Sequence, residues 1–292
     1  ALGLSALLAF LLARQLLKPI RTIANAGDRL AGGDYSIRLD NNRHDELGAL
    51  LHQFNTLAEN LEARDLAERK WVSDTSHELK TPLAVLRAQI EAIQDGVHEG
   101  NEKRLKELHT STMRLSQLVA DLNTLSNARE GQLAITKQIK DIAEIAETTL
   151  EQAIQSLPDL GLKMQGNIEP RVLLNCDRLR MGQLLDNLLQ NARRYTSSPG
   201  TIRLTLSRHS DGIEITVEDT PPCPPQSARD KLFDRFYREE LSRDRKYGGS
   251  GLGLSICREI VHAHGGTISL SQSTLGGLKV RVLLPEGQST NE

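Results

Sequence analysis

Apolar residues spaced by alternating steps of three and four constrain the fold of this 292-residue chain more than any other feature. This spacing is a heptad seam, the pattern by which a helix packs against others in a coiled coil or bundle. The first seam consists of Leu47, Leu50, Phe54, Leu57 and Leu61. A shorter helical pattern, from Ile20 to Leu30, precedes it and ends at Gly32-Gly33. Because a helix, a polar connector and a second helix cannot bury their seams alone, we expect two chains to associate as a parallel four-helix bundle.

A second, longer seam follows and is out of phase with the first. It consists of Val72, Ser76, Leu79, Leu83, Leu86, Ile90, Ile93 and Val97, and a partner helix across a hairpin near 95–101 carries Leu105, Leu108, Thr112, Leu115, Val119 and Leu122. We expect two such helices per chain to form another four-helix bundle with a second chain. Leu61 and Val72 are eleven residues apart, a heptad plus four, and such a stutter locally unwinds a left-handed coil. The phase break can couple the two bundles for signalling, so that one relaxes when the other is strained. Alternatively, it can be an accommodated irregularity without a signalling role.

The first thirteen residues, ALGLSALLAFLLA, carry no charge, and Arg14, Lys18 and Arg21 follow them. A membrane span needs about 20 apolar residues, and no basic segment precedes this stretch as it would in a signal peptide. We therefore expect residues 1–17 to be the C-terminal part of a transmembrane helix, with the basic residues on the cytoplasmic side. The alternative is an amphipathic or buried helix.

From about residue 131 the pattern changes to strand-like runs that alternate with helical ones. The expected strands are 132–137, 162–168, 171–175, 201–209, 212–219, 267–273 and 278–285. Residues 201–219 form a predicted hairpin that turns at Ser210-Asp211-Gly212. This mixture predicts an α+β two-layer sandwich, and we expect the tail, 287–292, to be disordered.

The composition argues against some classes of function. Lys and Arg total 36 against 38 Asp and Glu, for a net charge of -2, and aromatic residues make up 3%. A nucleic-acid-binding protein usually has a basic excess and aromatic stacking platforms, so we expect no direct nucleic-acid binding. Cys176, Cys223 and Cys257 lack the spacing of metal ligands, and we expect no disulfide.

The stretch SHELKTPL, residues 76–83, places Pro82 inside a predicted helix, at a cost of about 3 kcal/mol. His77 directly follows a seam position, so its imidazole should face solvent at the flank of the bundle. A neutral imidazole is a competent nucleophile at about pH 7 when its other nitrogen is held, which the adjacent Glu78 can do. Thr81, one turn on, can orient a water molecule. The stretch therefore suggests a reactive turn loosened by proline, whereas a lone helix histidine is more often a solvated or core residue.

A polar stripe runs along the helix predicted at 186–196. Asn187, Asn191 and Arg194 lie at positions i, i+4 and i+7, on one face. Amide oxygens suit a hydrated Mg²⁺ ion, Arg194 can neutralise phosphate oxygens, and Tyr195 can pack on a base. The alternative is an ordinary amphipathic helix that buries Leu184, Leu185, Leu188 and Leu189.

Glycines gather just before an apolar helix in YGGSGLGLSICREIV, residues 247–261. Glycine lets backbone N–H groups approach phosphates closely, and a helix N-terminus favours negative charge. A Walker loop does not fit because no GKS or GKT follows, and no βαβ unit opens there as a Rossmann turn requires. By itself the glycine cluster is a weak signal.

Together, the stretches SHELKTPL, NLLQNARRYT, LFDRFYR and GGSGLGLSI, in this order and spacing, resemble those of the bacterial two-component sensor histidine kinases. The resemblance covers essentially the whole chain and is greatest to the Bae/Cpx-like envelope-stress sensors. It implies a HAMP linker domain at 18–65, a dimerisation and histidine-phosphotransfer domain at 66–128, and a catalytic ATP-binding domain at 132–286. The implied fold is multidomain, with an all-α HAMP domain and four-helix dimerisation bundle followed by an α+β two-layer ATP-binding sandwich of the gyrase type.

The resemblance also implies roles for individual residues. His77 would take the γ-phosphoryl group of ATP and pass it to an aspartate of a response regulator, with Glu78 as general base and Thr81 serving the reverse, phosphatase reaction. Asn191 would ligate Mg²⁺, and Asp219 would accept a hydrogen bond from the adenine amino group. The rest of the nucleotide site would comprise Asn187, Arg194, Tyr195, Phe236, Gly249, Gly251, Leu252 and Gly253, with Phe233 and Phe236 as hinges of a mobile lid. The protein would be a homodimer in the bacterial inner membrane, with its HAMP and kinase domains in the cytoplasm.

One segment departs from the family's pattern. Where the family usually has Asp-x-Gly-x-Gly, this chain has DTPPCPP, with Pro221 and Cys223 at the glycine positions. Glycine allows close backbone approach, whereas proline fixes φ and removes a donor. Because Asp219 is kept, we expect an active kinase. The alternatives are a nucleotide-impaired scaffold or phosphatase, and a gyrase-like ATPase that forms no phosphohistidine.

Overall fold

The computed structural model describes residues 2–96, 101–129, 133–157, 161–238 and 250–286. The chain divides into two compact units, Ala1–Ser76 and His77–Glu292. Within the described residues, no helix offers a stretch that is both long and apolar enough to cross a membrane.

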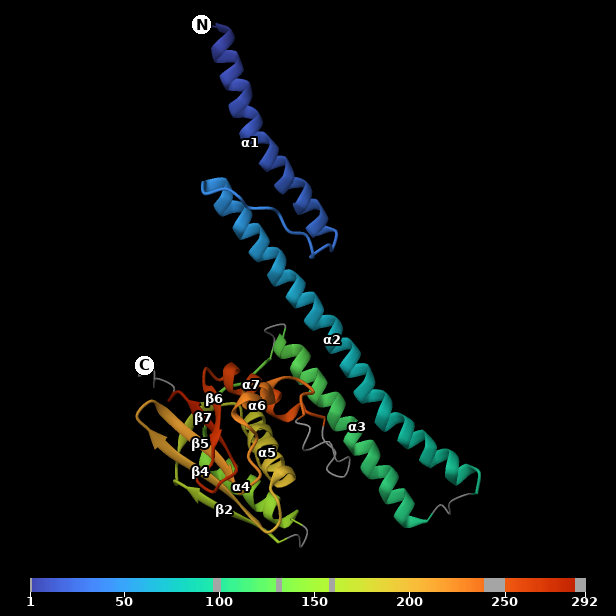
Figure 1. The fold of residues 1–292 in the computed structure, drawn as a ribbon. Helices are drawn as coiled ribbons and strands as arrows, with labels where there is room; N and C mark the ends of the chain where they lie inside the picture. Colours follow the sequence, from blue (N-terminus) through green and yellow to red (C-terminus); the bar gives the residue numbers. More distant parts are fainter. Residues whose placement is uncertain (1, 97–100, 130–132, 158–160, 239–249, 287–292) are drawn as a thin grey trace. The chain divides into compact units, whose positions relative to one another are not determined.

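The first unit consists of helix α1, Leu2–Ala31, a connector, and the beginning of helix α2, Glu46–Gln94 (Figure 1). Helix α1 ends beside the predicted glycine pair, where Gly33 takes a left-handed φ of 91°. The small core of this unit is formed by Ala26, Leu30, Ile37 and Ala58, with Tyr35, Leu39, Phe54 and Leu61 packed against it. Asn55 fixes the connector to α2, because its Oδ1 accepts from the Leu39 N–H at 2.8 Å and its Nδ2 donates to the Leu39 carbonyl at 2.7 Å.

Helix α2 continues without interruption through the phase break and through Pro82. Helix α3, Glu102–Arg129, follows it in the chain. In the single chain, five residues of the second seam and its partner helix have exposed fractions between 39% and 59%: Val72, Leu83, Ile90, Leu105 and Val119. Rows of large apolar side chains in water are characteristic of a surface that another molecule covers.

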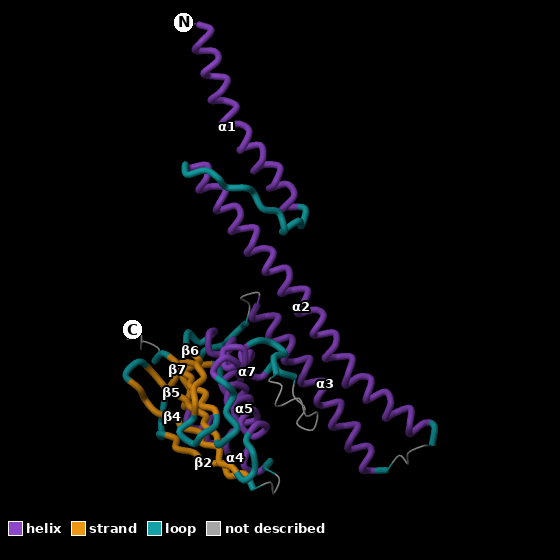
Figure 2. Tube along the Cα trace, in the orientation of Figure 1, coloured by secondary structure: helices purple, strands orange, loops and turns teal. Residues whose placement is uncertain are grey.

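The C-terminal part of the second unit is a mixed sheet covered on one face by helices (Figures 1 and 2). The strands are β2, Leu162–Ile168; β4, Gly200–His209; β5, Gly212–Asp219; β6, Thr267–Gln272; and β7, Leu278–Leu284. Their order is β2-β4-β5-β7-β6, with β2 parallel to β4 and the other neighbours antiparallel. The helices are α4, Ile142–Gln155; α5, Arg178–Tyr195; and α7, Gly253–Ala263, with the short α6, Gln226–Arg229, and a 3-10 turn, Asp230–Phe233.

Alternating strand residues and one face of each helix form the core between the two layers. Fully buried examples are Ile202, Leu204, Ile215 and Val282 of the sheet, with Leu184, Leu185, Ile256 and Ile260 of α5 and α7. Period-two burial on strands and helical burial against them is the arrangement that the sequence pattern predicts. The α+β two-layer sandwich is therefore confirmed.

The prediction of a strand at 132–137 is wrong. The strand begins later, as β1, Gln138–Asp141, and pairs antiparallel with β3, Leu173–Cys176. β3 cannot extend the ladder further, because the next residue, Asp177, caps helix α5. The Thr136 N–H donates to the Asp177 carboxylate at 2.9 Å instead of to a strand.

The other predicted strands are present, with ends within two residues of those expected. The hairpin turn is also confirmed, since β4 ends at His209 and β5 begins at Gly212. The predicted disordered tail, 287–292, lies outside the described residues.

Candidate functional site

His77 lies on helix α2 with its side chain exposed, as its position beside the seam predicts. Thr81 is also exposed, and its hydroxyl donates to the His77 carbonyl at 3.2 Å. Pro82 has no N–H to donate within the same turn. The turn therefore presents an imidazole to solvent and is held locally by a side-chain hydroxyl bond. The water-orienting role of Thr81 stays a prediction, and it requires the hydroxyl to leave this carbonyl.

Helix α5 is an amphipathic helix, and it also carries the predicted polar binding residues on one face. Leu184, Leu185, Leu188 and Leu189 are buried, while Asn187, Asn191, Arg194 and Tyr195 are partly exposed. Asp177 starts the helix by accepting from the N–H groups of Leu179 and Arg180 at 3.0 and 3.1 Å. The amphipathic helix thus positions the predicted polar residues along one accessible face.

The Asn187 amide lies beside the first residue of helix α7. A Cβ placed on Gly253 would be 3.9 Å from Asn187 Oδ1. The buried Asn187 Nδ2 has no hydrogen-bond partner among the described residues. A buried donor left unpaired is costly, and in native structures it commonly marks the place of a ligand or an unseen polar group.

The N-terminus of helix α7 adds further donors at this place. No side chain of the described residues caps it, and the preceding residue, Leu252, is fully buried. The first backbone N–H groups of a helix have no partners within it and carry a partial positive charge. The Asn187 amide and the start of α7 together therefore form a site suited to an anion.

The predicted hinge joins the end of one described segment to the start of the next. Phe236 and Gly251 both have left-handed φ values, 61° and 69°, and the Phe236 N–H donates to the Gly251 carbonyl at 3.1 Å. A Cβ on Gly251 would lie 2.9 Å from the Phe236 backbone, so the close approach requires glycine. Phe233 is buried beneath the Arg258 guanidinium, 5.7 Å from its ring centroid. The predicted site residue Gly249 lies outside the described residues.

Asp219 ends strand β5 and is only 5% exposed. Its Oδ1 accepts from the Leu278 N–H at 2.6 Å. Burial raises the pKa of this carboxyl to about 7, against the opposing effect of the Leu278 hydrogen bond. At neutral pH a small change in surroundings therefore decides whether Asp219 is charged.

The sequence reasoning missed two glycines: Gly277 makes room for this carboxylate, and Gly276 for the ring of Pro221. A Cβ on Gly277 would come 2.1 Å from Asp219 Oδ1. Gly276, with φ of 98°, lies against the Pro221 ring, 3.2 Å from the Cβ it would carry. The available signal was a Gly-Gly pair just before a strand, which indicates close backbone approach.

The proline-rich segment after Asp219 is tied to its neighbours. The Pro221 carbonyl accepts from the Ser197 N–H at 3.1 Å. Arg229 donates to the Pro224 carbonyl at 3.2 Å and to Cys223 Sγ at 3.4 Å. The substituted glycine positions thus form a defined loop beside the buried carboxyl.

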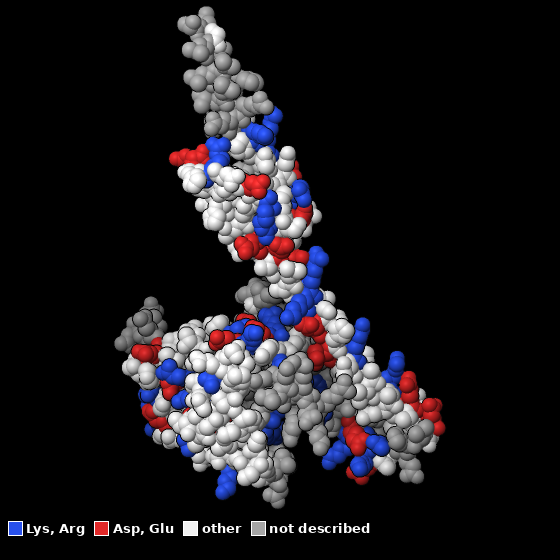
Figure 3. All heavy atoms as spheres, viewed as in Figure 1, with Lys and Arg blue, Asp and Glu red and all other residues white. Residues whose placement is uncertain are grey.

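Positive charge gathers at the C-terminal end of α5. Burial lowers the pKa of Arg194, and the positive charges of Arg238 and Arg193 lower it further, while Tyr195 opposes the shift. Crowded guanidinium groups gain from a bound anion. Over the face shown in Figure 3, by contrast, basic and acidic side chains are interspersed.

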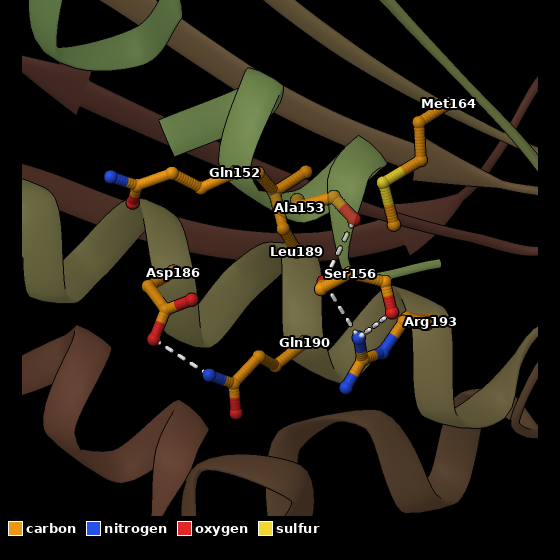
Figure 4. A pocket seen from close by; sticks show the side chains of 8 residues that line it. All are labelled: Gln152, Ala153, Ser156, Met164, Asp186, Leu189, Gln190 and Arg193. Atoms are coloured by element: carbon orange, nitrogen blue, oxygen red, sulfur yellow. Dashed lines mark hydrogen bonds between the residues drawn. The ribbon is translucent and has the colours of Figure 1, made fainter. Parts of the chain in front are cut away.

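A separate cleft of about 310 Å³ lies between α4, α5 and β2 (Figure 4). It is lined by Gln152, Ala153, Ser156, Met164, Asp186, Leu189, Gln190 and Arg193. Its α5 residues lie on a different face of the helix from Asn187 and Asn191. Arg193 Nη1 is already bound to the Ser156 carbonyl and hydroxyl at 3.2 and 3.0 Å. The cleft is therefore distinct from the candidate nucleotide site.

Three family descriptions match the chain in succession. Residues 11–63 match the HAMP domain, and residues 67–131 match the His Kinase A (phospho-acceptor) domain. Residues 176–288 match the histidine kinase-, DNA gyrase B-, and HSP90-like ATPase family.

Similar proteins agree with these matches. The signal transduction histidine-protein kinase BaeS of Escherichia coli (strain K12) is 41% identical over 97% of this chain and 60% of its own length. The sensor protein CutS of Streptomyces coelicolor is 30% identical over 94% of this chain and 67% of its own length. The structure of the histidine kinase AdeS of Acinetobacter baumannii shares 28% sequence identity, with a TM-score of 0.61 over 72% of this chain and 98% of that chain.

These findings define the class of protein. A helical phospho-acceptor region precedes an ATPase sandwich in which an asparagine helix faces a glycine-started helix. The chain belongs to the sensor histidine kinases and carries their HAMP, phospho-acceptor and ATPase domains. It spans about three fifths of the length of several curated relatives that it matches.

Proposed function

We propose that this chain phosphorylates itself on His77 with the γ-phosphoryl group of Mg-ATP and then passes that group to an aspartate of a response regulator. The observation that carries the proposal is the buried Asn187 Nδ2, which has no hydrogen-bond partner among the described residues, beside the start of α7, which no described side chain caps. A nucleotide phosphate supplies the acceptor that both need.

The residues of the site have separate tasks in binding the nucleotide. Asp219 accepts from the adenine amino group, and Tyr195, Phe236 and Leu252 border the nucleotide. The N–H groups from Gly249 to Gly253 and the Arg194 guanidinium neutralise the phosphates. Asn191, partly exposed on the same face as Asn187, offers an amide oxygen to a hydrated Mg²⁺, a coordination that this ion accepts. When bound, Mg²⁺ would neutralise charge on the phosphates and orient them.

At His77 the reaction is an in-line displacement. An imidazole nitrogen forms a bond to the γ-phosphorus, and the bond from that phosphorus to the bridging oxygen breaks, so that ADP leaves. Glu78 holds the other ring nitrogen and stabilises the positive charge that forms on the ring. Catalysis comes mainly from positioning and charge stabilisation. The reverse direction, hydrolysis of the phosphorylated regulator, would use Thr81 once its hydroxyl leaves the His77 carbonyl.

The exposed apolar seams support a homodimer, and the sequence of residues 1–17 supports a place at the inner membrane. The exposed seam residues on α2 and α3 are large and apolar, and a second copy of this chain would cover them in a four-helix bundle. Residues 1–17 would continue a transmembrane helix, with the basic residues after them and all later domains in the cytoplasm.

A second candidate function follows from the proline loop. Pro221 and Cys223 replace the family's glycines, which favours a scaffold or phosphatase with impaired nucleotide binding. The ordered carboxyl at Asp219 favours the kinase.

Calorimetric titration with a non-hydrolysable ATP analogue and Mg²⁺ separates these two functions. The kinase requires saturable binding that Asn187→Leu weakens at least tenfold, because the amide lies at the anion site. Gln190→Leu, on the neighbouring face of α5, is the matched control and should bind as the parent does. A folded parent that binds no analogue would leave the scaffold as the better account.

A further inference from the structure

One hydrogen bond, one sulfur–oxygen approach and one pair of neighbouring residues define a single antiparallel register of α5 and α7. At the start of α7, Gly253 lies beside Asn187. In its middle, Cys257 Sγ is 3.8 Å from the Leu184 carbonyl oxygen. At its end, His264 Nε2 accepts from the Asp177 N–H at 3.1 Å.

The register is kept over the whole length of the shorter helix. From Gly253 to His264 the chain advances eleven residues, and from Asn187 back to Asp177 it advances ten. At 1.5 Å per residue these are about 16 and 15 Å of helix. An axial shift at the His264 end would therefore reach the Gly253 end nearly undiminished, since so short a helix moves as a rigid body.

His264 makes this contact through one neutral tautomer. The side chain is buried, 6% exposed, and its Nδ1 lies 2.8 Å from the Ile260 carbonyl oxygen. That carbonyl can only accept, so the hydrogen-bond pattern assigns the ring proton to Nδ1. Nε2 is then free of a proton and accepts from Asp177.

Asp177 connects the same point to the segment that follows α3. Its carboxylate accepts from the Thr136 N–H at 2.9 Å as well as from the first turn of α5. One residue thus contacts the linker before β1, the start of α5 and the end of α7.

We propose that His264 is a positioning residue that sets the axial register of α7 on α5, and so places the first turn of α7 opposite Asn187. This inference rests on the proposed function, because that is where the nucleotide phosphates would bind. His264 touches no reacting group and acts through Asp177 and the two helices.

Protonation should break the contact. A proton on Nε2 would face the Asp177 N–H, donor against donor. Burial lowers the pKa of His264, the positive Lys137 lowers it further, and the Ile260 carbonyl bond and the negative Asp177 carboxylate oppose the shift. The register should therefore persist at neutral pH and weaken only below the usual titration range of histidine.

Two isosteric variants separate the two ring nitrogens. His264→Gln can place an amide oxygen near the position of Nε2, which keeps the acceptor for Asp177 and cannot be charged. His264→Asn keeps only a donor near Nδ1 for the Ile260 carbonyl. Binding of a non-hydrolysable ATP analogue with Mg²⁺ to the full chain should be about tenfold weaker for His264→Asn, and within twofold of the parent for His264→Gln. As the pH is lowered below 6.5, the parent should lose affinity relative to His264→Gln.

Hydrogen exchange at the amides of residues 253–257 in nucleotide-free protein gives a second readout. It should be faster in His264→Asn than in His264→Gln. If the two folded variants bound the analogue equally and exchanged equally, the inference would be overturned. His264 would then be a purely structural residue, whether or not both variants had a lowered melting temperature. If the parent itself bound no analogue, the proposed function would fail, and the exchange comparison would still decide whether His264 sets the register.

Discussion

The Asp219 carboxylate accepts the Leu278 N–H at 2.6 Å from within a pocket that Gly277 keeps open. The Asp219 side chain is 5% exposed, and the backbone N–H of Leu278 holds it in position. Because it is buried, the negative charge of its carboxylate form is poorly solvated. This combination makes Asp219 a sensitive reporter of nucleotide binding.

Asp219 should make the stability of the ATPase domain fall as the pH rises. The folded pKa, about 7, lies above the usual value of 3.8, so the stabilising effect of the protonated group is complete below about pH 4 and is lost as the pH rises through 7. The loss is at most about 4 kcal/mol. Urea unfolding between pH 4 and 8 should show Asp219→Asn gaining stability relative to the parent as the pH rises. Parallel curves for the two proteins would mean that Asp219 is not perturbed.

Nucleotide binding should release protons at neutral pH. An adenine amino group donates to a carboxylate and so favours the charged form of Asp219, which is only about half ionised at pH 7. Calorimetric titrations with ADP in two buffers of different ionisation enthalpy should show up to about half a proton released per nucleotide. Asp211→Asn, at the exposed hairpin turn, is the control and should release as much as the parent. The same release in Asp219→Asn would assign it to another group.

Gly277→Ala should destabilise the protein and weaken nucleotide binding together. The new Cβ would lie 2.1 Å from Asp219 Oδ1 and 2.5 Å from the Asp219 backbone oxygen, so the carboxyl and its strand must shift. We expect a loss of about 1–3 kcal/mol in the free energy of unfolding. Gly182→Ala in α5, where a Cβ meets nothing within 4 Å, should instead stabilise by about 0.5–1 kcal/mol. Undiminished stability of Gly277→Ala would be inconsistent with this packing.

Residues inserted between Leu61 and Val72 should change the balance of kinase and phosphatase activities. The phase break lies within one continuous helix, so each inserted residue turns the following part by about 100°. A series of one to seven insertions should show activities that vary with the helical period, and a full heptad should restore the parent's balance. Activities that stay constant across the series would identify the break as an accommodated irregularity.

Local pattern predicted most of the fold. β3, β4 and β7 show period-two burial, whereas β5 is buried along nearly its whole length; α5 and α7 carry apolar faces, so most elements were visible within their own stretch of sequence. The strand at 132–137 was misplaced because its true extent depends on a partner, β3, that ends where Asp177 begins a helix. Pairing partners are not encoded in the alternation of a single strand.

The site could be predicted only in part, for a similar reason. Asn187, Asp219 and Gly253 lie in recognisable motifs, whereas Gly277 matters only because it meets Asp219 from just before the neighbouring strand β7, 58 residues later in the chain. His264 and Asp177 are 87 residues apart and lie outside the quoted motifs. Contacts of this kind depend on the packing of whole elements, which single-sequence patterns do not specify.

Incubation of the parent chain and of His77→Gln with Mg²⁺ and γ-labelled ATP would show directly whether His77 is the phosphoryl acceptor. We predict acid-labile, base-stable label that appears only in the parent, because the exposed His77 imidazole is the acceptor. Label of the same kind and amount in His77→Gln, or no label in a parent that binds nucleotide as a folded dimer, would contradict this prediction.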